Sequence, residues 1–193
     1  MLIVPAPLRK QWPVEPADKF FLPSIVVDTQ TANALKKDGM QNPFLVNQKM
    51  VICLFQFAFA KRSLVREVNW DLVVVDEAHR LRSIYKDTKT AEGVFDAIRP
   101  ARKLLLTATS LQNSLWELYG LVSILDAELF GSKEAFQAKF LSTDNVDERN
   151  VALRERFQHL CKRTLRKQVA EFIPFTNRYT HPSSQRVIAC PES

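Results

Sequence analysis

The stretch that decides the fold is Leu72-Val73-Val74-Val75-Asp76-Glu77-Ala78-His79. Aliphatic residues in a row, apolar on both faces, are typical of a strand buried in a parallel sheet. The run stops at adjacent carboxylates, so we expect the strand to deliver Asp76 and Glu77 to the carboxyl edge of the sheet, where such sheets bind ligands. Because neighbouring side chains on a strand point to opposite faces, both acids can face one ligand only where the strand gives way to a turn.

Similar aliphatic runs recur along the chain and are separated by longer amphipathic segments. The expected strands are Leu2–Val4, Ile25–Val27, Val51–Leu54, Leu72–Val75 and Lys103–Leu106. The segments 7–21 and 29–37 are long enough for the helices that connect parallel strands. The predicted fold class is therefore α/β, a parallel sheet with flanking helices.

After Thr109 the apolar spacing changes to that of helices. It predicts a helix around 115–125, another at Phe136 and Phe140 after Gly131, a polar loop over 144–149, and an apolar stripe from Leu153 to Val169. Between positions 150 and 180 the basic residues are Arg154, Arg156, Lys162, Arg163, Arg166, Lys167 and Arg178. A solvated helix face and a phosphate-facing surface explain this cluster equally well. The tail 181–193 is expected to be irregular.

The composition narrows the possible classes. A chain of 193 residues, 46% hydrophobic and 25% charged, is long enough for one packed domain and is neither disordered nor fibrous. It has no apolar run long enough for a membrane span and no secretory signal at its start. The formal net charge of +6 weakly favours an acidic partner such as nucleic acid. Cys53, Cys161 and Cys190 lack metal-ligand spacing, so we expect buried thiols in a reducing compartment.

Glycine usage limits the function. The chain has 4 glycines, and none belongs to a Gly-x-x-x-x-Gly-Lys-Ser/Thr or Gly-x-Gly-x-x-Gly pattern. Such patterns build the loops whose backbone N–H groups cradle phosphates. We therefore expect no phosphate-binding loop within these residues.

Two motifs carry the chemistry. The carboxylates of Asp76 and Glu77 suit nucleotide hydrolysis, in which one holds Mg²⁺ on the phosphates and its neighbour deprotonates the attacking water. The alternative is an exposed acidic turn that caps the next helix. The second motif, Leu104–Asn113, ends a strand in small hydroxyl residues that can hydrogen-bond a neighbouring histidine or carboxylate. Here the alternative is a helix cap, and alone it would be preferred.

Together, in this order, the two motifs resemble motifs II and III of superfamily-two helicases. The wider sequence resembles the SWI/SNF-type branch of DNA-translocating ATPases, its RapA-like bacterial members in particular, over about positions 1 to 180. Segment 2–12 (LIVPAPLRKQW) is similar to motif Ia and 51–57 (VICLFQF) to the motif Ib region. The further matching phrases are DEAHRLR (76–82), LLLTATSLQNSLWELYGLVSILD (104–126) and CKRTLRKQV (161–169).

The resemblance implies a RecA-like lobe and roles for individual residues. Asp76 would be the Mg²⁺ ligand, Glu77 the general base, and both would be catalytic. The nucleotide site would comprise Asp76, His79, Thr107, Ala108, Thr109 and Gln112, with Asn113 continuing motif III. The contacts to DNA phosphates would come from Pro5, Ala6, Arg9 and Lys10. Ser110 departs from the family pattern, which usually has proline there.

The resemblance also implies the cofactors ATP and Mg²⁺ and a set of partners. These are the backbone of double-stranded DNA, the remaining part of the same translocase and RNA-polymerase-like machinery, with no membrane. The location would be cytoplasmic, at a bacterial nucleoid. The implied organisation is a partial ATP-binding lobe over 1–141, a basic amphipathic helical segment over 142–180 and the irregular tail 181–193.

Departures from the family pattern lead to further expectations. The P-loop precedes motif Ia in the family, and here Met1 stands at motif Ia, so the chain resembles an N-terminal lobe truncated before motif Ia. The second lobe, with its arginine, is also missing. Since the family's P-loop strand is central in the sheet, its loss is expected to leave strands with unpaired edges. Pro16 is expected to be costly inside the motif Ia helix.

Three functions therefore remain open. The first is a lobe of a DNA-dependent ATPase that is inactive alone and binds DNA weakly. The second is a non-catalytic DNA- or protein-binding remnant, or a non-functional fragment. The third and least favoured is a stand-alone metal-dependent hydrolase that uses Asp76 and Glu77 but lacks further metal ligands.

Overall fold

A computed structural model describes residues 1–79, 81, 89–107, 115–142, 145–161, 178–180 and 187–189. The chain forms two compact units, Met1–Leu153 and Arg154–Ser193, and each is described by itself. Among the described residues, no helix has the length and apolarity that a bilayer crossing requires.

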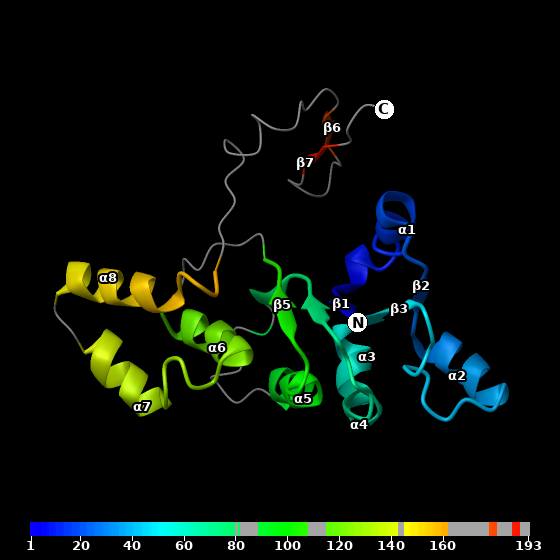
Figure 1. Cartoon of the computed structure of the whole chain (residues 1–193), viewed down its shortest axis with the longest axis horizontal. Helices are drawn as coiled ribbons and strands as arrows, with labels where there is room; N and C mark the ends of the chain where they lie inside the picture. Colours follow the sequence, from blue (N-terminus) through cyan, green and yellow to red (C-terminus); the bar gives the residue numbers. More distant parts are fainter. Residues whose placement is uncertain are drawn as a thin grey trace. The chain divides into compact units, whose positions relative to one another are not determined.

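The first unit is built on a parallel five-stranded sheet (Figure 1). Its strands are β1 (Leu2–Val4), β2 (Ser24–Val26), β3 (Met50–Leu54), β4 (Val73–Val75) and β5 (Lys103–Leu105). Their order is β2-β3-β1-β4-β5, and every neighbouring pair is parallel. This confirms the predicted α/β class and each of the predicted strands.

The sheet is continuous, which changes one expectation. β1 pairs directly with β3 and β4, and β4 pairs directly with β5. The open edge expected from the missing strand therefore lies at the outside of the sheet and not within it. Among the strands that the structure describes, β2 and β5 form the outer edges.

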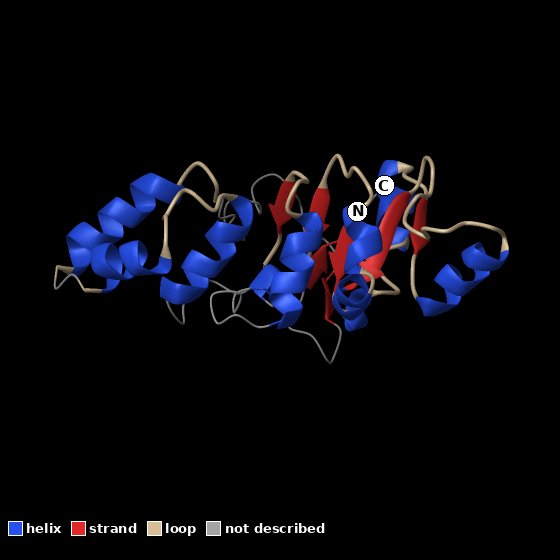
Figure 2. Ribbon diagram, turned by 90° about the horizontal axis from the view of Figure 1, so that it is seen from below, coloured by secondary structure: helices blue, strands red, loops and turns tan. Residues whose placement is uncertain are grey.

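One face of the sheet carries most of the core. Ile3, Cys53 and Val75 lie in register on this face and are fully buried. They belong to one hydrophobic cluster with residues of α3 (Phe55–Ala60), α4 (Arg62–Arg66) and α5 (Lys89–Ile98). Figure 2 shows these helices packed along the strands. Burial on this face is the main source of stability of the unit.

The opposite face is more thinly covered. Leu2, Val4 and Ile52 are buried there beneath Trp12, which lies between the 3₁₀ helix η1 (Ala6–Leu8) and α1 (Val14–Phe20). Figure 1 shows α1 on the side of the strands away from α3 and α5. Leu104 of β5 has the register of Val74 on this face and is 47% exposed. On this face the sheet is therefore covered by side chains at β1 and β3 but is exposed to solvent at β5.

The connection from β1 to β2 tolerates its proline. Pro16 is the third residue of α1 and is buried. In the first turn of a helix the backbone N–H has no intrahelical partner, so a proline loses no hydrogen bond there. The expected cost of Pro16 inside a continuing helix was wrong, because the helix begins only at Val14.

The second connecting helix forms where the sequence predicts it. α2 spans Thr29–Lys37. The Asp28 side chain accepts a hydrogen bond of 2.9 Å from the backbone N–H of Thr31 and caps the helix. This cap fixes both the start of α2 and the position of Asp28 at the carboxyl end of β2.

A helical region follows β5. α6 (Leu115–Leu125) and α7 (Lys133–Phe136), which continues into a π-helix (Gln137–Leu141, η3), match the predicted helices. Aromatic rings join them, with Phe136 centred 4.9 Å from Tyr119, 5.1 Å from Phe130 and 5.1 Å from Phe140. Tilted ring pairs at these distances add to the stabilisation from burial alone.

The last long helix differs from the predicted pattern. α8 spans Val146–Phe157 and begins inside the expected polar loop, because the Asn145 side chain accepts hydrogen bonds from the backbone N–H groups of Asp147 and Glu148. Leu153 of the expected apolar stripe is buried in this helix, whereas Leu160 and Cys161 beyond its end are exposed. The remaining stripe positions, Leu165 and Val169, lie outside the described residues.

The second unit contains a short antiparallel hairpin. β6 (Arg178–Thr180) pairs with β7 (Val187–Ala189), with Tyr179 opposite Ile188. The helical segment was expected to extend to 180 and the tail from 181 to be irregular, so both expectations differ from the structure here. Val187, Ile188 and Tyr179 are β-branched or aromatic residues that favour strands.

Candidate active site

Asp76 and Glu77 lie in a turn that directly follows β4, and the flanking strands fix its backbone. The N–H of Asp76 donates to the carbonyl of Ile3 in β1 at 2.9 Å. The N–H of Ala78 donates to the carbonyl of Leu106, just past β5, at 2.8 Å. The two hydrogen bonds extend the sheet past the end of β4, so the turn is held at the carboxyl edge from both sides.

Glu77 has a left-handed backbone conformation. Its φ is +53°, and its residue is only 8% exposed. A non-glycine residue in this region costs about 1–2 kcal/mol, and such strain tends to occur at functional sites. The conformation breaks the alternation of the strand, and so provides the turn that two adjacent carboxylates need in order to face one ligand.

Both oxygens of the Asp76 carboxylate accept hydrogen bonds. Oδ1 accepts from the backbone N–H of Glu77 at 2.8 Å, and Oδ2 accepts from the Trp12 indole Nε1–H at 2.9 Å. A carboxylate has about four acceptor positions, so these two donors orient the group and leave lone pairs for a cation.

Glu77 is close to His79. Its Oε2 lies 3.2 Å from Nδ1 of His79, and the two side chains are 10% and 27% exposed. The histidine therefore lies next to the carboxylate that the sequence predicts to be the base. Asp76, Glu77 and His79 are thus brought together by one turn at the end of one strand.

The predicted motif III residues are described only in part. Thr107 is exposed and follows Leu106, whose N–H donates to the carbonyl of Val75 at 2.9 Å. This hydrogen bond places the start of motif III beside the end of β4, next to Asp76. Ala108, Thr109, Gln112 and Asn113 lie outside the described residues.

The predicted DNA-contacting segment leaves the carboxyl end of β1. Pro5 is buried, whereas Ala6, Arg9 and Lys10 are exposed. The Arg9 guanidinium forms an ion pair of 2.7 Å with Oδ2 of Asp28, which follows β2. Ala6, Arg9 and Lys10 are therefore accessible to a partner, but Arg9 already has a carboxylate to which it binds.

Sequence reasoning missed two residues of this edge. Trp12 belongs to the quoted motif Ia segment, yet nothing in the spacing indicated that its indole reaches Asp76 across 64 positions. Asp28 carried a detectable pattern, because it directly follows an aliphatic strand just as Asp76 does. The recurrence of an aliphatic run that ends in aspartate could have indicated it.

The donor chemistry of the turn suits Mg²⁺. This ion prefers hard oxygen ligands, and it is usually held by one or two carboxylates, with phosphates and waters completing its shell. No group of three or more His, Cys, Asp or Glu side chains is placed to hold a metal among the described residues. Asp76 therefore fits a Mg²⁺ that arrives with phosphates, rather than a metal held entirely by protein.

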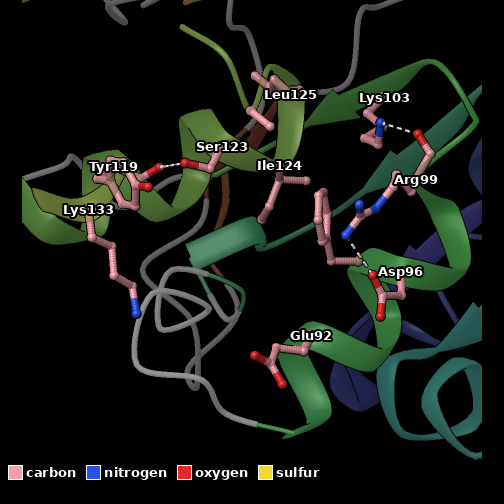
Figure 3. A pocket seen from close by; sticks show the side chains of 11 residues that line it. Glu92, Asp96, Arg99, Lys103, Tyr119, Ser123, Ile124, Leu125 and Lys133 are labelled. Carbon is pink, nitrogen blue, oxygen red and sulfur yellow. Dashed lines mark hydrogen bonds and ion pairs between the residues drawn. The ribbon is translucent and has the colours of Figure 1, made fainter. Parts of the chain in front are cut away.

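A cavity of about 570 Å³ lies away from this edge (Figure 3). It is lined by residues of α5, β5 and α6, by Ala127 and by Lys133 of α7. Lys103 is the first residue of β5, at the end of the strand opposite to Thr107. Lys103 Nζ donates to the carbonyl of Arg99, and burial, then the nearby Arg99 charge, lower the pKa of Lys103. Of the predicted site residues that the structure describes, none lines the cavity.

Comparison with known families identifies the class of the chain. The model of the SNF2-related domain matches residues 1–190, so the chain belongs to the SNF2-related domain family. The parallel five-stranded sheet with its flanking helices is thus a RecA-like α/β fold within this family.

Individual relatives agree with this class. The chain is 34% identical over 144 residues to an uncharacterized ATP-dependent helicase, YqhH, of Bacillus subtilis (strain 168). The aligned region covers 72% of the chain and 23% of that protein. It is 26% identical over 178 residues to the ISWI chromatin-remodeling complex ATPase CHR11 of Arabidopsis thaliana, covering 90% of the chain and 16% of the relative. The chain thus spans less than a quarter of either protein.

A solved structure has the same fold. It is the Sulfolobus solfataricus SWI2/SNF2 ATPase core in complex with dsDNA, with a TM-score of 0.63 and 18% sequence identity. The match covers 84% of this chain and 33% of the solved one.

Proposed function

We propose that this chain supplies the DEAH carboxylates and the motif Ia surface of an ATPase that couples ATP hydrolysis to movement along double-stranded DNA. The observation that carries the proposal is the Asp76–Glu77 turn, which the left-handed Glu77 and two flanking strands hold at the carboxyl edge of the sheet. We further propose that these residues alone do not turn over ATP, because no phosphate-binding loop occurs in their sequence.

The residues of the turn have separate roles in this proposal. Asp76 holds the Mg²⁺ with its oriented carboxylate, and the ion neutralises phosphate charge when it is bound. Glu77 accepts a proton from the attacking water at its carboxylate. His79, 3.2 Å from Glu77 Oε2, orients this base and links it to motif III, which begins at Thr107 beside the turn.

The sheet favours one place for the missing phosphate-binding segment. A strand added at the outer edge of β5 would lie two strand spacings from β4, about 10 Å, whereas one added at β2 would lie about 19 Å away. The exposed side chain of Leu104 leaves apolar surface beside that edge of β5. Since parallel sheets are normally covered on both faces, a strand and helix from outside these residues fit there.

The DNA part of the proposal rests on the exposed side of motif Ia. Arg9 and Lys10 are exposed cations on the segment that leaves β1, next to the strand that ends in the catalytic turn. Such side chains contact phosphates and carry no sequence information. The solved SWI2/SNF2 core of the same fold is a complex with dsDNA, which supports double-stranded DNA as the partner.

The proposal is tested by supplying the missing part. We would compare the chain alone with the chain fused at its amino end to the strand, phosphate loop and helix of an SNF2-family relative. We expect Mg²⁺-dependent binding of a fluorescent ATP analogue only in the fusion. Asp76→Asn in the fusion is expected to weaken the Mg²⁺-dependent part of this binding by tenfold or more.

Two outcomes would contradict the proposal, and each would contradict a different part of it. DNA-stimulated ATP turnover by the chain alone, abolished by Glu77→Gln, would show that the chain is an active ATPase without a recognisable phosphate loop. A folded fusion that binds the nucleotide no better than the chain alone would show that the turn is not part of a nucleotide site. In that case a non-catalytic DNA- or protein-binding role would be the better account.

A further inference from the structure

Trp12 connects the predicted DNA-facing segment with the predicted metal ligand. Its indole N–H donates to Asp76 Oδ2 at 2.9 Å, although the two residues are far apart in sequence. We propose that Trp12 is a positioning residue: it orients the Asp76 carboxylate for the divalent cation and transmits the position of the motif Ia segment to this carboxylate. The inference rests on the proposed function, in which Asp76 holds the metal.

The two donors of Asp76 determine how its carboxylate is oriented. The backbone N–H of Glu77 binds Oδ1, and the Trp12 indole binds Oδ2. With one donor on each oxygen, rotation of the carboxylate about its bond to Cβ is restricted. Hydrogen bonds to an ionised acceptor are also shorter and stronger than neutral ones. Without the indole, the carboxylate would be held on one side only.

Packing fixes the indole itself. Trp12 is half-buried on the sheet face formed by Leu2, Val4 and Ile52, which are 2% exposed or less. Interlocked side chains in such surroundings have few alternative rotamers. The position of the Nε1–H relative to β4 is therefore determined by the sheet and by the backbone of the motif Ia segment.

The segment from Pro5 to Trp12 is a continuous series of tight turns. The N–H of Leu8 donates to the carbonyl of Pro5 at 3.0 Å, and that of Arg9 donates to Ala6 at 3.3 Å. The N–H groups of Gln11 and Trp12 both donate to the carbonyl of Leu8 at 3.1 Å. Because these turns share their hydrogen bonds, a displacement at Arg9 or Lys10 is expected to move Trp12 as well.

A coupling follows from this connection. If a DNA backbone bound at Arg9 and Lys10 favours one position of the segment, it also favours one orientation of Asp76. Thermodynamic linkage then requires that the cation changes the protein's affinity for DNA by the same factor as the DNA changes its affinity for the cation. A Trp12 that only packs on the sheet would produce no such coupling.

The test uses the fusion described above, which supplies the phosphate-binding loop, with the ATP analogue bound. Mn²⁺ is the paramagnetic substitute for Mg²⁺, and the backbone amide resonance of Glu77 is the reporter. Trp12→Phe removes the indole N–H and keeps an aromatic ring. Trp70→Phe is the matched control, because the Trp70 indole donates to the carbonyl of Val65 at 2.9 Å and not to Asp76. We expect Trp12→Phe to weaken Mn²⁺ binding at Asp76 about fivefold, and Trp70→Phe to leave it within twofold.

A second arm tests the coupling with a short DNA duplex. In the wild type we expect the duplex to tighten Mn²⁺ binding at least threefold, and in Trp12→Phe we expect no change. Thermal unfolding of both variants shows whether they are equally folded. If they are, a merely structural role of Trp12 cannot account for a selective loss at Asp76.

The outcomes separate the two proposals. Mn²⁺ broadening near Glu77 that Asp76→Asn leaves unchanged, or no broadening in the wild type, would overturn the metal assignment of the proposed function. Broadening that is lost in Asp76→Asn but is equal in Trp12→Phe and Trp70→Phe would leave that function intact and overturn only the positioning role of Trp12.

Discussion

The guanidinium of Arg9 lies 2.7 Å from the carboxylate of Asp28, so an arginine predicted to bind DNA is paired with the acid that caps α2. The pKa of Asp28 is lowered, first by the hydrogen bond from the backbone N–H of Thr31 and to a smaller extent by Arg9. The Arg9 side chain remains 46% exposed. A phosphate that binds Arg9 must therefore compete with Asp28.

The first prediction concerns this competition. Asp28→Asn keeps a good helix cap but removes the charge that holds Arg9. We expect duplex DNA binding to tighten severalfold at low salt, measured by fluorescence anisotropy. Asp18→Asn removes the same charge from an exposed position of α1 and serves as the control. An equal effect of both variants would show that only net charge matters and that Arg9 is not released.

Glu77 gives a prediction about backbone strain. At an ordinary position, alanine is more stabilising than glycine, but at φ +53° the order should reverse. We expect Glu77→Gly to have a free energy of unfolding about 1 kcal/mol higher than Glu77→Ala, measured by urea denaturation. Since neither variant has a carboxylate, the comparison isolates the backbone. A more stable alanine variant would contradict the left-handed turn.

Gly93 gives a prediction about helix packing. A Cβ atom added to it would lie 2.6 Å from Cδ2 and Cε2 of the Phe59 ring, where α5 crosses α3. Because a packed core yields little, we expect Gly93→Ala to destabilise the fold by about 1–3 kcal/mol. In a Phe59→Leu background the same change should cost clearly less. Equal costs in both backgrounds would mean that the two helices do not meet at this residue.

Cys53 gives a pH-dependent prediction. Complete burial raises the pKa of its thiol to about 12 from an ordinary value of 9.0. Between these values the unfolded chain loses a proton that the folded chain retains, so stability falls as the pH rises, by up to about 1.4 kcal/mol per pH unit. Denaturation of the wild type and of Cys53→Ala at several alkaline pH values isolates this contribution.

Reactivity provides the control for the same residue. We expect a thiol reagent to label the exposed Cys161 in the folded protein and Cys53 only after unfolding. An unchanged pH slope in Cys53→Ala, or rapid labelling of Cys53 in the folded protein, would contradict its burial in the core.

The sheet was predictable from the sequence because each of its strands is a short aliphatic run with a clear end. The run Leu72–Val75 followed by Asp76 is the clearest example, and β4 forms there. The carboxyl edge followed from the same pattern. The start of α8 could not be predicted from the sequence, because Asn145 caps a helix within a segment whose composition is also typical of a loop.

Contacts between distant segments could not be predicted in the same way. The bond between Trp12 and Asp76 depends on the sheet order, which places β1 beside β4, and on the turns after β1. The Arg9–Asp28 pair depends on the cap that fixes Asp28. In both cases the residue types are ordinary, and only the three-dimensional arrangement gives them a role.

The most direct test of the central claim is ATP binding by the purified chain, measured by calorimetry with and without Mg²⁺ and duplex DNA. The claim is that the acidic turn is one half of a nucleotide site whose phosphate-binding half lies outside these residues. We predict that the folded chain shows no measurable ATP binding under any of these conditions. Micromolar, Mg²⁺-dependent binding that is lost in Asp76→Asn would contradict this and would mean that the chain assembles a complete nucleotide site by itself.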